Sequence, residues 1–485
     1  MPDVLLIDVR LPAITGESGA ILMRDRRLTA LGTEPEMRRL AKPGTNVVDG
    51  EGGLALPGFH DAHLHLLSYA RSLSTVDCSA LTSIASIRSA LTRKARELPA
   101  GAWLQATHYD DARLAERRHP NRRDLDAVST RHPIRLRHRG LHLDVLNTAA
   151  LQALQLADAP ASMAERDGES GELTGRLFHA GAAIARQTRR FRGRGVEASV
   201  RQASQRLLSM GVTSVQDASV TNGSEQWTLF QQLSQAGALR QRVVMLPGYP
   251  GFREVHGAAS STPMVRPAQV KLMVNELDAD PAELRAATAD VRAASGSVAI
   301  HAATEAELVI ALDALEKAGP ACGPLPDRIE HGSSIPDALL SRVREARVTV
   351  VGNPAWLCER SDVYEALHAR EVHSWLHRAR SLLAAGIPYA AGSDGPVVEP
   401  NPMLSLFALG HRKLGAAERL SMAQALAAIT HWPAQAVGAG RKLGRLRPGS
   451  LADVVVLDRD PQAWRPGDPS PVRLTIVDGR VAWRR

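Results

Sequence analysis

Cysteine is scarce in this chain, and long apolar runs are absent. Of 485 residues only three are cysteine, namely Cys78, Cys322 and Cys358, and no two of them form a Cys-x-x-Cys pair. A small, odd number of thiols excludes a disulfide-stabilised secreted domain and favours a reducing compartment. No apolar stretch approaches the roughly 20 residues of a membrane-spanning helix, and the N-terminus lacks a basic and apolar leader. We therefore expect a cytoplasmic protein without a membrane segment.

Lysine and aromatic residues are also rare. Six of the 59 basic residues are lysines, so 53 are arginines, and aromatic residues make up 4% of the chain. The formal net charge is +8 at pH 7. The arginines are scattered, and no stretch combines aromatic with basic side chains, so the pattern favours a GC-rich genome over a phosphate-binding surface. We expect a small-molecule substrate and no specific nucleic-acid partner, with nonspecific charge binding as the weaker alternative.

Both ends of the chain have the pattern of short β-strands. Apolar runs at residues 4–9, 20–24 and 46–48 alternate with glycine, proline and Asp-Gly, and another run covers 452–457. Residues 474–483 are typical of a hairpin around Asp478-Gly479, a pair that favours a type I′ turn. Because the middle of the chain has a different pattern, we predict that residues 1–55 and 436–485 form one small composite β-sandwich domain.

The middle of the chain alternates compact apolar runs with helical patterns from about residue 205. Helix start signals lie at Asp280, Thr304 and Ser421. Repeated strand–helix units predict a parallel sheet. Together with the segment around His63 the predicted strands number eight, and the other seven cover residues 212–216, 243–246, 270–274, 298–301, 328–331, 348–352 and 388–393.

Eight strand–helix units are the number that closes a TIM-like (β/α)8 barrel. We therefore predict an α/β fold in which residues 56–435 form such a barrel. About 130 residues separate the first two strands, which is far more than an ordinary connection needs. We predict that residues 67–200 form an inserted subdomain beside the barrel mouth.

The most informative feature is a pair of histidines one residue apart, His63 and His65. They end the run Leu-Pro-Gly-Phe-His-Asp-Ala-His-Leu-His at residues 56–65. Residues i and i+2 of a strand point to the same face, so two imidazoles are presented together as metal ligands. Such a pair alone is weak evidence for a metal site, because surface strands carry it by chance. A metal site therefore requires further ligands elsewhere in the chain.

Four more ionisable residues lie in predicted strands or at their ends. Lys271 is the only lysine between residues 95 and 316 and lies in an apolar run, where burial depresses a lysine pKa. His301, His331 and Asp394 end the fifth, sixth and eighth strands. Each has an ordinary interpretation: a salt-bridged lysine on the outer face, a hydrogen-bonded core histidine, or a turn aspartate. Together with the histidine pair they are explained more simply by bound cations, because barrel sites form at the C-terminal strand ends.

The order of these motifs along the chain is specific. It is similar to that of the amidohydrolase superfamily and, within it, the YtcJ-like branch (amidohydrolase family 3), which is related to N-substituted formamide deformylase. In the predicted insertion, Gly140-Leu-His142 before Asn147 and Gly171-Glu-Leu-Thr-Gly175 also resemble this branch. The similarity extends nearly from end to end, and the other matching runs are residues 56–65, 211–218, 270–272, 299–302, 328–332, 392–396 and 449–458.

The resemblance implies a binuclear metal centre. The implied ligands are His63, His65, Lys271, His301, His331 and Asp394. The histidine pair binds a buried ion shared with Asp394, and the other two histidines bind a second ion. A neutral lysine amine reacts with carbon dioxide to give a carbamate, which is the expected bridge at Lys271. Zinc is the favoured divalent ion for this set of nitrogen and oxygen donors.

The implied reaction is hydrolysis of an amide or other non-peptide carbon–nitrogen bond in a small molecule. Paired cations lower the pKa of a bridging water and supply hydroxide. Asp394 is then expected to act as general base and afterwards as general acid, with His142 facing the substrate carbonyl. The same site could instead serve decarboxylation, isomerisation or hydration, and a non-catalytic barrel is a further alternative.

Two departures from the branch concern the substrate pocket. Asn275-Glu276 stands where the branch usually has Asp-Gly, and Ala302-Ala-Thr-Glu305 stands where Gly-Asp is usual. The implied metal ligands survive both changes. The substrate of characterised relatives is therefore not transferred to this chain.

Few aromatic residues are available to contact a substrate. Trp103 and Tyr109 in the predicted insertion are candidate substrate contacts, and Trp356 lies near another plausible mouth position. Ordinary packing explains each of them at least as well. The sequence does not determine the oligomeric state, for which a homodimer is the working expectation.

Overall fold

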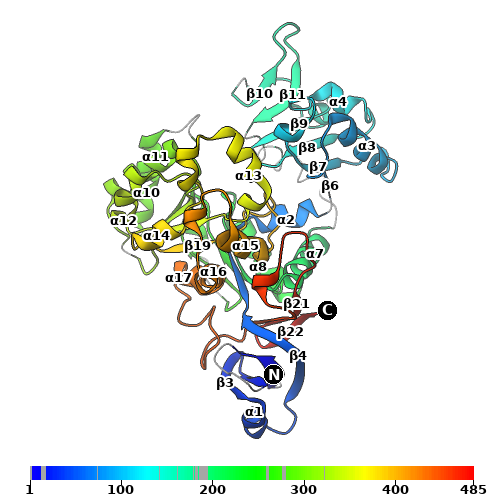
Figure 1. Ribbon diagram of the computed structural model, residues 1–485. Helices are drawn as coiled ribbons and strands as arrows, with labels where there is room; N and C mark the ends of the chain where they lie inside the picture. Colours follow the sequence, from blue (N-terminus) through cyan, green and yellow to red (C-terminus); the bar gives the residue numbers. More distant parts are fainter. Residues whose placement is uncertain are drawn as a thin grey trace. The chain divides into compact units, whose positions relative to one another are not determined.

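The computed structural model describes residues 3–11, 18–73, 75–140, 142–160, 162–178, 180, 184, 195–257, 262–275, 280–321 and 323–485. Cys322 and Glu276 lie outside these ranges. The chain forms two compact units, one containing Met1–Leu66 with Ala203–Arg485 and the other Leu67–Gln202 (Figure 1). The smaller unit comprises nearly the same residues as the insertion predicted at 67–200.

One sheet of the larger unit joins both ends of the chain. Its strand order is β22-β21-β20-β4-β1-β2-β3, and Figure 1 shows β4 in blue beside the dark red β21 and β22. Asp478 and Gly479 both have positive φ between β21 and β22, as a type I′ turn requires. The strands are β1 Val4–Arg10, β2 Gly19–Arg24, β3 Arg27–Thr33, β4 Asn46–Pro57, β20 Val454–Leu457, β21 Val472–Val477 and β22 Arg480–Arg484.

Parallel strands form two further sheets in this unit. Their orders are β14-β13-β12-β5 and β15-β16-β17-β18-β19. The strands are β5 Phe59–Leu64, β12 Val212–Asp217, β13 Arg242–Met245, β14 Val265–Pro267, β15 Val270–Leu272, β16 Val298–Ala302, β17 Arg328–His331, β18 Thr349–Gly352 and β19 Tyr389–Ala391.

The predicted α/β class is confirmed, but strand pairing among the described residues does not close one continuous barrel. Single parallel bridges connect the two sheets, between Leu64 and Gly395 and between Gly248 and Lys271. The fourth predicted strand, at 270–274, is shorter than expected, and β14 extends the neighbouring sheet just before it. Pro267, which has no amide hydrogen to donate, lies at this division.

Helices alternate with the parallel strands, and several begin at the predicted signals. The side chains of Asp280, Thr304 and Ser421 accept hydrogen bonds from backbone amides of α10, α11 and α16. The helices are α1 Glu34–Leu40, α2 Leu66–Ser72, α3 Ile84–Ala95, α4 Arg122–Asp126, α5 Thr148–Ala153, α7 Val196–Ser209, α8 Ser224–Gln235, α9 Phe252–Gly257, α10 Pro281–Ala293, α11 Glu305–Ala318, α12 Leu340–Glu345, α13 Trp356–Leu367, α14 Arg380–Ala384, α15 Pro402–His411, α16 Met422–Ala428 and α17 His431–Ala436.

The main apolar core lies between the β15–β19 sheet and the helices that follow its strands. It includes Val298 and Ile300 of β16, Leu312 of α11 and Leu406 of α15, each at most 1% exposed. Close packing of this kind holds the strand ends in fixed positions. None of the described helices combines the length and apolar character needed to span a bilayer.

The smaller unit has its own six-stranded sheet and its own core. The sheet order is β10-β11-β9-β8-β7-β6, and Leu104, Leu136 and Val145 are among its buried side chains. The strands are β6 Val76–Asp77, β7 Leu104–Tyr109, β8 Ile134–His138, β9 Leu143–Leu146, β10 Ala164–Arg166 and β11 Leu173–Phe178.

Candidate metal centre

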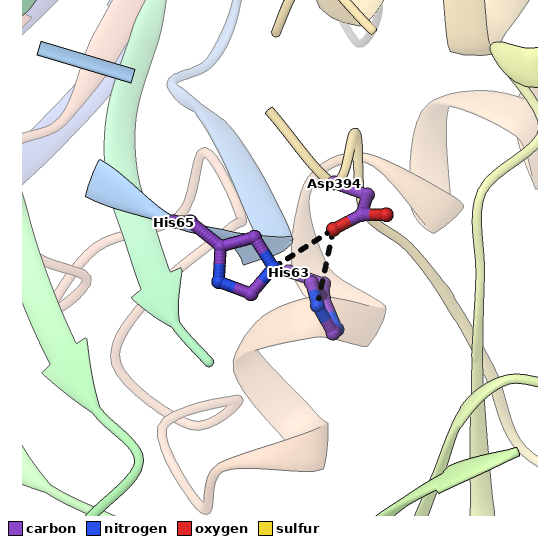
Figure 2. A group of neighbouring side chains, drawn as sticks. All are labelled: His63, His65 and Asp394. Carbon is purple, nitrogen blue, oxygen red and sulfur yellow. Dashed lines mark ion pairs between the residues drawn. The ribbon is translucent and has the colours of Figure 1, made fainter. Parts of the chain in front are cut away.

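Three of the candidate ligands meet where β5 and β19 end. His63 lies in β5, His65 follows that strand, and Asp394 lies in the loop after β19. Asp394 Oδ1 is 3.0 Å from His65 Nε2 and 3.5 Å from His63 Nε2 (Figure 2). Possible ligand atoms of all three residues lie within 4.8 Å of one another. We refer to this group as the metal centre.

The backbone of the two strand ends fixes this geometry. The Asp394 amide donates to the His63 carbonyl oxygen at 2.7 Å, and the His65 amide donates to the Gly395 carbonyl oxygen at 2.8 Å. Asp394 has a φ of 61°, in the left-handed region that non-glycine residues adopt rarely. A Cβ at Gly392 would lie 2.6 Å from the His63 backbone nitrogen. The close approach of the two strands therefore requires glycine at this position.

Asp61 also links these two strand ends by hydrogen bonds. Its carboxylate accepts hydrogen bonds from the Ser393 amide at 3.0 Å, the Ser393 hydroxyl at 2.6 Å and the His63 amide at 3.1 Å. Burial raises the pKa of Asp61 to about 6, although the bonds from Ser393 favour its charged form. Asp61 thus orients the loop that carries Asp394.

Glu330 determines which nitrogen of His63 is available to a metal. Its carboxylate contacts His63 Nδ1 and is held by Arg328, whose Nε and Nη2 lie 2.7 and 3.0 Å from its two oxygens. Burial would raise the pKa of Glu330, but Arg328 and His63 outweigh it and keep the carboxylate ionised. An ionised carboxylate only accepts, so Nδ1 carries the proton of His63. Burial lowers the pKa of His63 to about 3, so its Nε2 keeps a free lone pair at neutral pH.

Asn353 determines in the same way which nitrogen of His331 is available to a metal. Its Nδ1 lies 2.7 Å from Asn353 Oδ1, and Asn353 Nδ2 donates to the Gly392 carbonyl oxygen at 3.2 Å. The amide oxygen accepts, so Nδ1 of His331 is the donor and Nε2 has the lone pair. The His331 ring centre is 4.8 Å from that of His63 and 4.5 Å from that of His301. His301 of β16 and His331 of β17 therefore lie beside the metal centre.

Lys271 is a fully buried amine. Its side chain points from β15 into the interior, is 1% exposed, and its Nζ makes no hydrogen bond with the described residues. Burial lowers the pKa of Lys271 to about 8, although Glu330 and Asp394 oppose this. Burial without a hydrogen bond therefore favours the neutral amine of Lys271.

The donor set fits a divalent cation. His63 Nε2 is buried and forms no hydrogen bond in the described part of the chain, and Asp394 Oδ1 lies 3.5 Å from it and 3.0 Å from His65 Nε2. Burial would raise the pKa of Asp394, but His65, with His331 and His63, outweighs it and lowers that pKa. The lone pair of His63 Nε2 and the carboxylate oxygen of Asp394 face each other in a buried site, and they repel unless a cation lies between them.

The three candidate residues of the predicted insertion lie in the smaller unit. Tyr109 ends β7 and is fully buried, with its hydroxyl 3.2 Å from His119 Nδ1. Trp103 precedes β7 and packs partly buried against a second core of that unit. His142 directly precedes β9. Their assignment as substrate contacts stays a prediction.

A second group of possible metal ligands occurs in the smaller unit, and we call it the insertion cluster. It consists of Asp110, Asp111 and His138. His138 Nε2 is 3.1 Å from Asp111 Oδ1. The Gly140 amide donates to His138 Nδ1 at 3.1 Å. Because Nδ1 is the acceptor, Nε2 of a neutral His138 carries the proton, and this nitrogen offers no lone pair to a metal.

Sequence reasoning gave no role to three residues that support the ligands. Glu330, Asn353 and Asp61 each bond to a ligand or its loop, and each lies one to three positions from a predicted strand-end residue. Glu330 could have been found, because a buried charged residue in an apolar strand requires a charged partner. Asn353 gave no such signal, since polar residues are common where strands meet loops. Asp61 lies within β5 and could have been found by the same argument as Glu330.

Comparisons with known proteins agree with this geometry. The sequence pattern of the amidohydrolase family matches residues 46–482. N-substituted formamide deformylase of Arthrobacter pascens is 26% identical over an alignment 539 positions long, which covers 100% of this chain and 99% of that protein. The putative amidohydrolase YtcJ of Bacillus subtilis (strain 168) is 23% identical, with 96% of each chain covered.

Solved structures show the same fold. An uncharacterized metal-dependent hydrolase from Pyrococcus horikoshii OT3 matches with a TM-score of 0.76 at 23% identity, covering 96% of this chain and 99% of its own. The resemblance seen in the sequence motifs is thereby confirmed. The chain belongs to the amidohydrolase family and is a hydrolase.

Proposed function

We propose that this protein hydrolyses an amide or another non-peptide carbon–nitrogen bond of a small molecule. One observation carries the proposal: His63 and His331 each have Nδ1 engaged by a fixed acceptor, which leaves both Nε2 lone pairs free, and His63 Nε2 lies 3.5 Å from Asp394 Oδ1. Imidazole nitrogens held in this way are the usual ligands of hydrolytic metal sites. The name of the deformylase relative, which refers to an amide bond, supports the choice of bond.

The proposed centre holds two divalent ions. His63, His65 and Asp394 are assigned to one ion, and His301 and His331 to the other. Lys271, as a carbamate formed with carbon dioxide, is assigned to both, because its buried Nζ has no other partner among the described residues. Zinc suits this mixture of nitrogen and oxygen donors. When bound, such ions lower the pKa of water towards neutrality and polarise a carbonyl group.

Asp394 is the proposed proton carrier. Its Oδ1 lies beside His63 and His65, and its low pKa keeps it ionised and able to accept a proton from the attacking water. The same carboxyl group then donates that proton to the leaving nitrogen. Asp61 and the Gly392 backbone keep the carboxylate aimed at this position. His142 is proposed to face the substrate carbonyl from the insertion.

The two parallel sheets are inferred to act as one (β/α)8 scaffold. Both sheets contribute ligands, and the Leu64–Gly395 and Gly248–Lys271 bridges lie next to ligand positions. Sites of this fold form at the C-terminal strand ends. This is where His65, His301, His331 and Asp394 lie.

Metal analysis together with an amide assay tests the proposed function. The purified protein is loaded with zinc or manganese in bicarbonate, and its metal content is measured. Simple formamides and acetamides are then assayed for release of both amine and carboxylic acid. We expect two ions per chain and stoichiometric products. Substoichiometric metal without any gain in hydrolysis after loading would contradict the proposal.

A further inference from the structure

Three exposed apolar side chains lie on loops next to the metal centre. Val220, Tyr249 and Met273 are 41%, 37% and 42% exposed. They follow β12, β13 and β15, at the C-terminal ends of these strands. The other large hydrophobic residues exposed in the described ranges lie on helices, on other sheets or at helix ends. Exposed apolar residues that gather at one functional edge point to a binding surface.

The three loops form one continuous surface. The Gly248 amide donates to the Asn222 carbonyl oxygen at 2.8 Å, and the Tyr249 amide donates to the Lys271 carbonyl oxygen at 3.3 Å. A Cβ at Gly248 would lie only 1.8 Å from the Val220 carbonyl oxygen, so these two backbones are in contact. We refer to Val220, Tyr249 and Met273 together as the apolar rim.

The apolar rim adjoins ligand positions. Ser219, which precedes Val220, has its Oγ 3.2 Å from His65 Nδ1. Met273 lies two residues after Lys271, beyond the end of β15. The Tyr249 ring stacks on the buried Phe252, with ring centres 6.1 Å apart, which holds the exposed ring in place. The loops that carry the apolar rim therefore adjoin the metal centre beside His65 and Lys271.

We propose that the apolar rim binds an alkyl or aryl group of the substrate, next to the bond that is cleaved. This inference rests on the proposed function and narrows it to small amides with an apolar substituent. Each methylene group that leaves water for an apolar surface improves affinity by up to about fourfold. A charged or strongly polar substituent gains nothing there, because these side chains offer no hydrogen bonds to replace those of water.

A binding experiment tests the inference without requiring turnover. The probes are straight-chain alkyl hydroxamic acids, whose polar head binds the metal and whose chain extends from it. Their Kd values for the metal-loaded protein are measured by calorimetry from the two-carbon to the eight-carbon member. We expect Kd to fall about two- to fourfold per methylene group until the rim is filled. A Kd independent of chain length would overturn the inference.

Matched variants locate the subsite. Val220→Ser and Val309→Ser make the same change at side chains that are both 41% exposed, but Val309 lies on α11. We expect Val220→Ser, and likewise Met273→Ser, to weaken the long-chain hydroxamate about tenfold and the short one little. Val309→Ser is expected to keep the native dependence on chain length. Equal effects of Val220→Ser and Val309→Ser in folded, metal-loaded protein would reject the rim as the subsite.

Hydrolysis of an N-alkyl formamide series separates this inference from the proposed function. If kcat/KM rises with alkyl length and Val220→Ser removes the rise, the inference and the proposed function are both supported. If formamides are cleaved with no preference for alkyl length, the inference fails while the proposed function stands. If no amide is cleaved although hydroxamate affinity depends on chain length and on Val220, the proposed function fails and the apolar subsite stands.

Discussion

The metal centre and the insertion cluster both bring imidazole and carboxylate groups within 4.8 Å of one another. The two groups differ in the hydrogen bond made by Nδ1 of the imidazole, the nitrogen that faces away from the carboxylate. In the metal centre, Glu330 accepts from His63 Nδ1, and Nε2 is left with a lone pair. In the insertion cluster, the Gly140 amide donates to His138 Nδ1, so Nε2 has the proton. The partner of the other nitrogen therefore decides whether an imidazole is a ligand or a hydrogen-bond donor.

The two groups also differ in their access to water. In the metal centre His63 is fully buried and Asp394 is 5% exposed beside a half-buried His65, whereas in the insertion cluster only Asp110 is buried and the side chains of His138 and Asp111 are 19% and 35% exposed. A carboxylate near an imidazole in water is an ordinary surface ion pair and contributes little. The same carboxylate and imidazole in a buried site are unfavourable unless another charge or hydrogen bond compensates for the lost water. Distance alone does not separate these cases, and the predictions below are designed to test whether hydrogen-bond partners do.

The largest expected effect concerns Asp394. Asp394→Asn keeps the shape but removes the proton acceptor, so kcat is expected to fall at least about 1,000-fold while most of the bound metal remains. Asp111→Asn makes the same change in the insertion cluster and is expected to leave the metal content unchanged. Steady-state kinetics and metal analysis of both variants check this. Turnover of Asp394→Asn near the native rate would remove Asp394 from the proton-transfer role.

The next effect concerns the buried lysine. Lys271→Ala is expected to lose one of two ions and most activity, and short carboxylic acids are expected to restore part of both, because they fill the place of the carbamate. Lys317, an exposed lysine of α11, provides the control Lys317→Ala, which we expect to resemble the native protein. Metal content with and without added acetate is the measurement. Full metal occupancy of Lys271→Ala in the absence of acid would contradict the carbamate assignment.

A smaller effect is expected at Glu330. Glu330→Gln replaces an ionised acceptor of His63 by a neutral amide, so metal affinity is expected to fall by about 10- to 100-fold. Asp144→Asn is the matched control, because Asp144 is also buried and pairs with an arginine, Arg135, at 2.8 Å. Both variants leave an arginine with a weaker partner and are expected to lower the free energy of unfolding. Only Glu330→Gln should change metal affinity, as measured by competition with a chelator.

The smallest effect is predicted for His138. His138→Gln is expected to leave the number of bound metal ions unchanged, since its Nε2 is a donor in the folded protein. Metal content of this variant, compared with His63→Gln, is the measurement. A loss of metal from His138→Gln equal to that from His63→Gln would show that the partner of Nδ1 does not predict ligand character.

Much of the fold could be predicted from sequence because the signals were local. The start of α10 at Asp280 and the positive φ of Asp478-Gly479 follow from the chemistry of two to four neighbouring residues. The strands β12, β13 and β15–β19 were found as apolar runs, but β14 and its division from β15 were not predicted. Pairing of a strand depends on its neighbours in space, which periodicity does not contain.

The support of the ligands was harder to predict, and β17 gives the reason. Strand alternation would place Glu330 and His331 on opposite faces. His331 has a φ of 72°, which breaks the alternation, and both side chains reach His63. A positive φ at a non-glycine residue carries no mark in the sequence. The sequence therefore marks Glu330 as a buried charge that requires a partner, but its contact with His63 became visible only in the folded chain.

The sequence by itself determined the family, the α/β class and the candidate ligands, because these depend on residue types at fixed positions along the chain. The tertiary structure decided which nitrogen of each imidazole is available and which of two similar clusters suits a metal. It also decided where exposed apolar side chains adjoin the site. These properties depend on burial and on hydrogen bonds between residues far apart in sequence, such as His63 with Glu330 and Asp61 with Ser393. Such contacts exist only once the strands have come together.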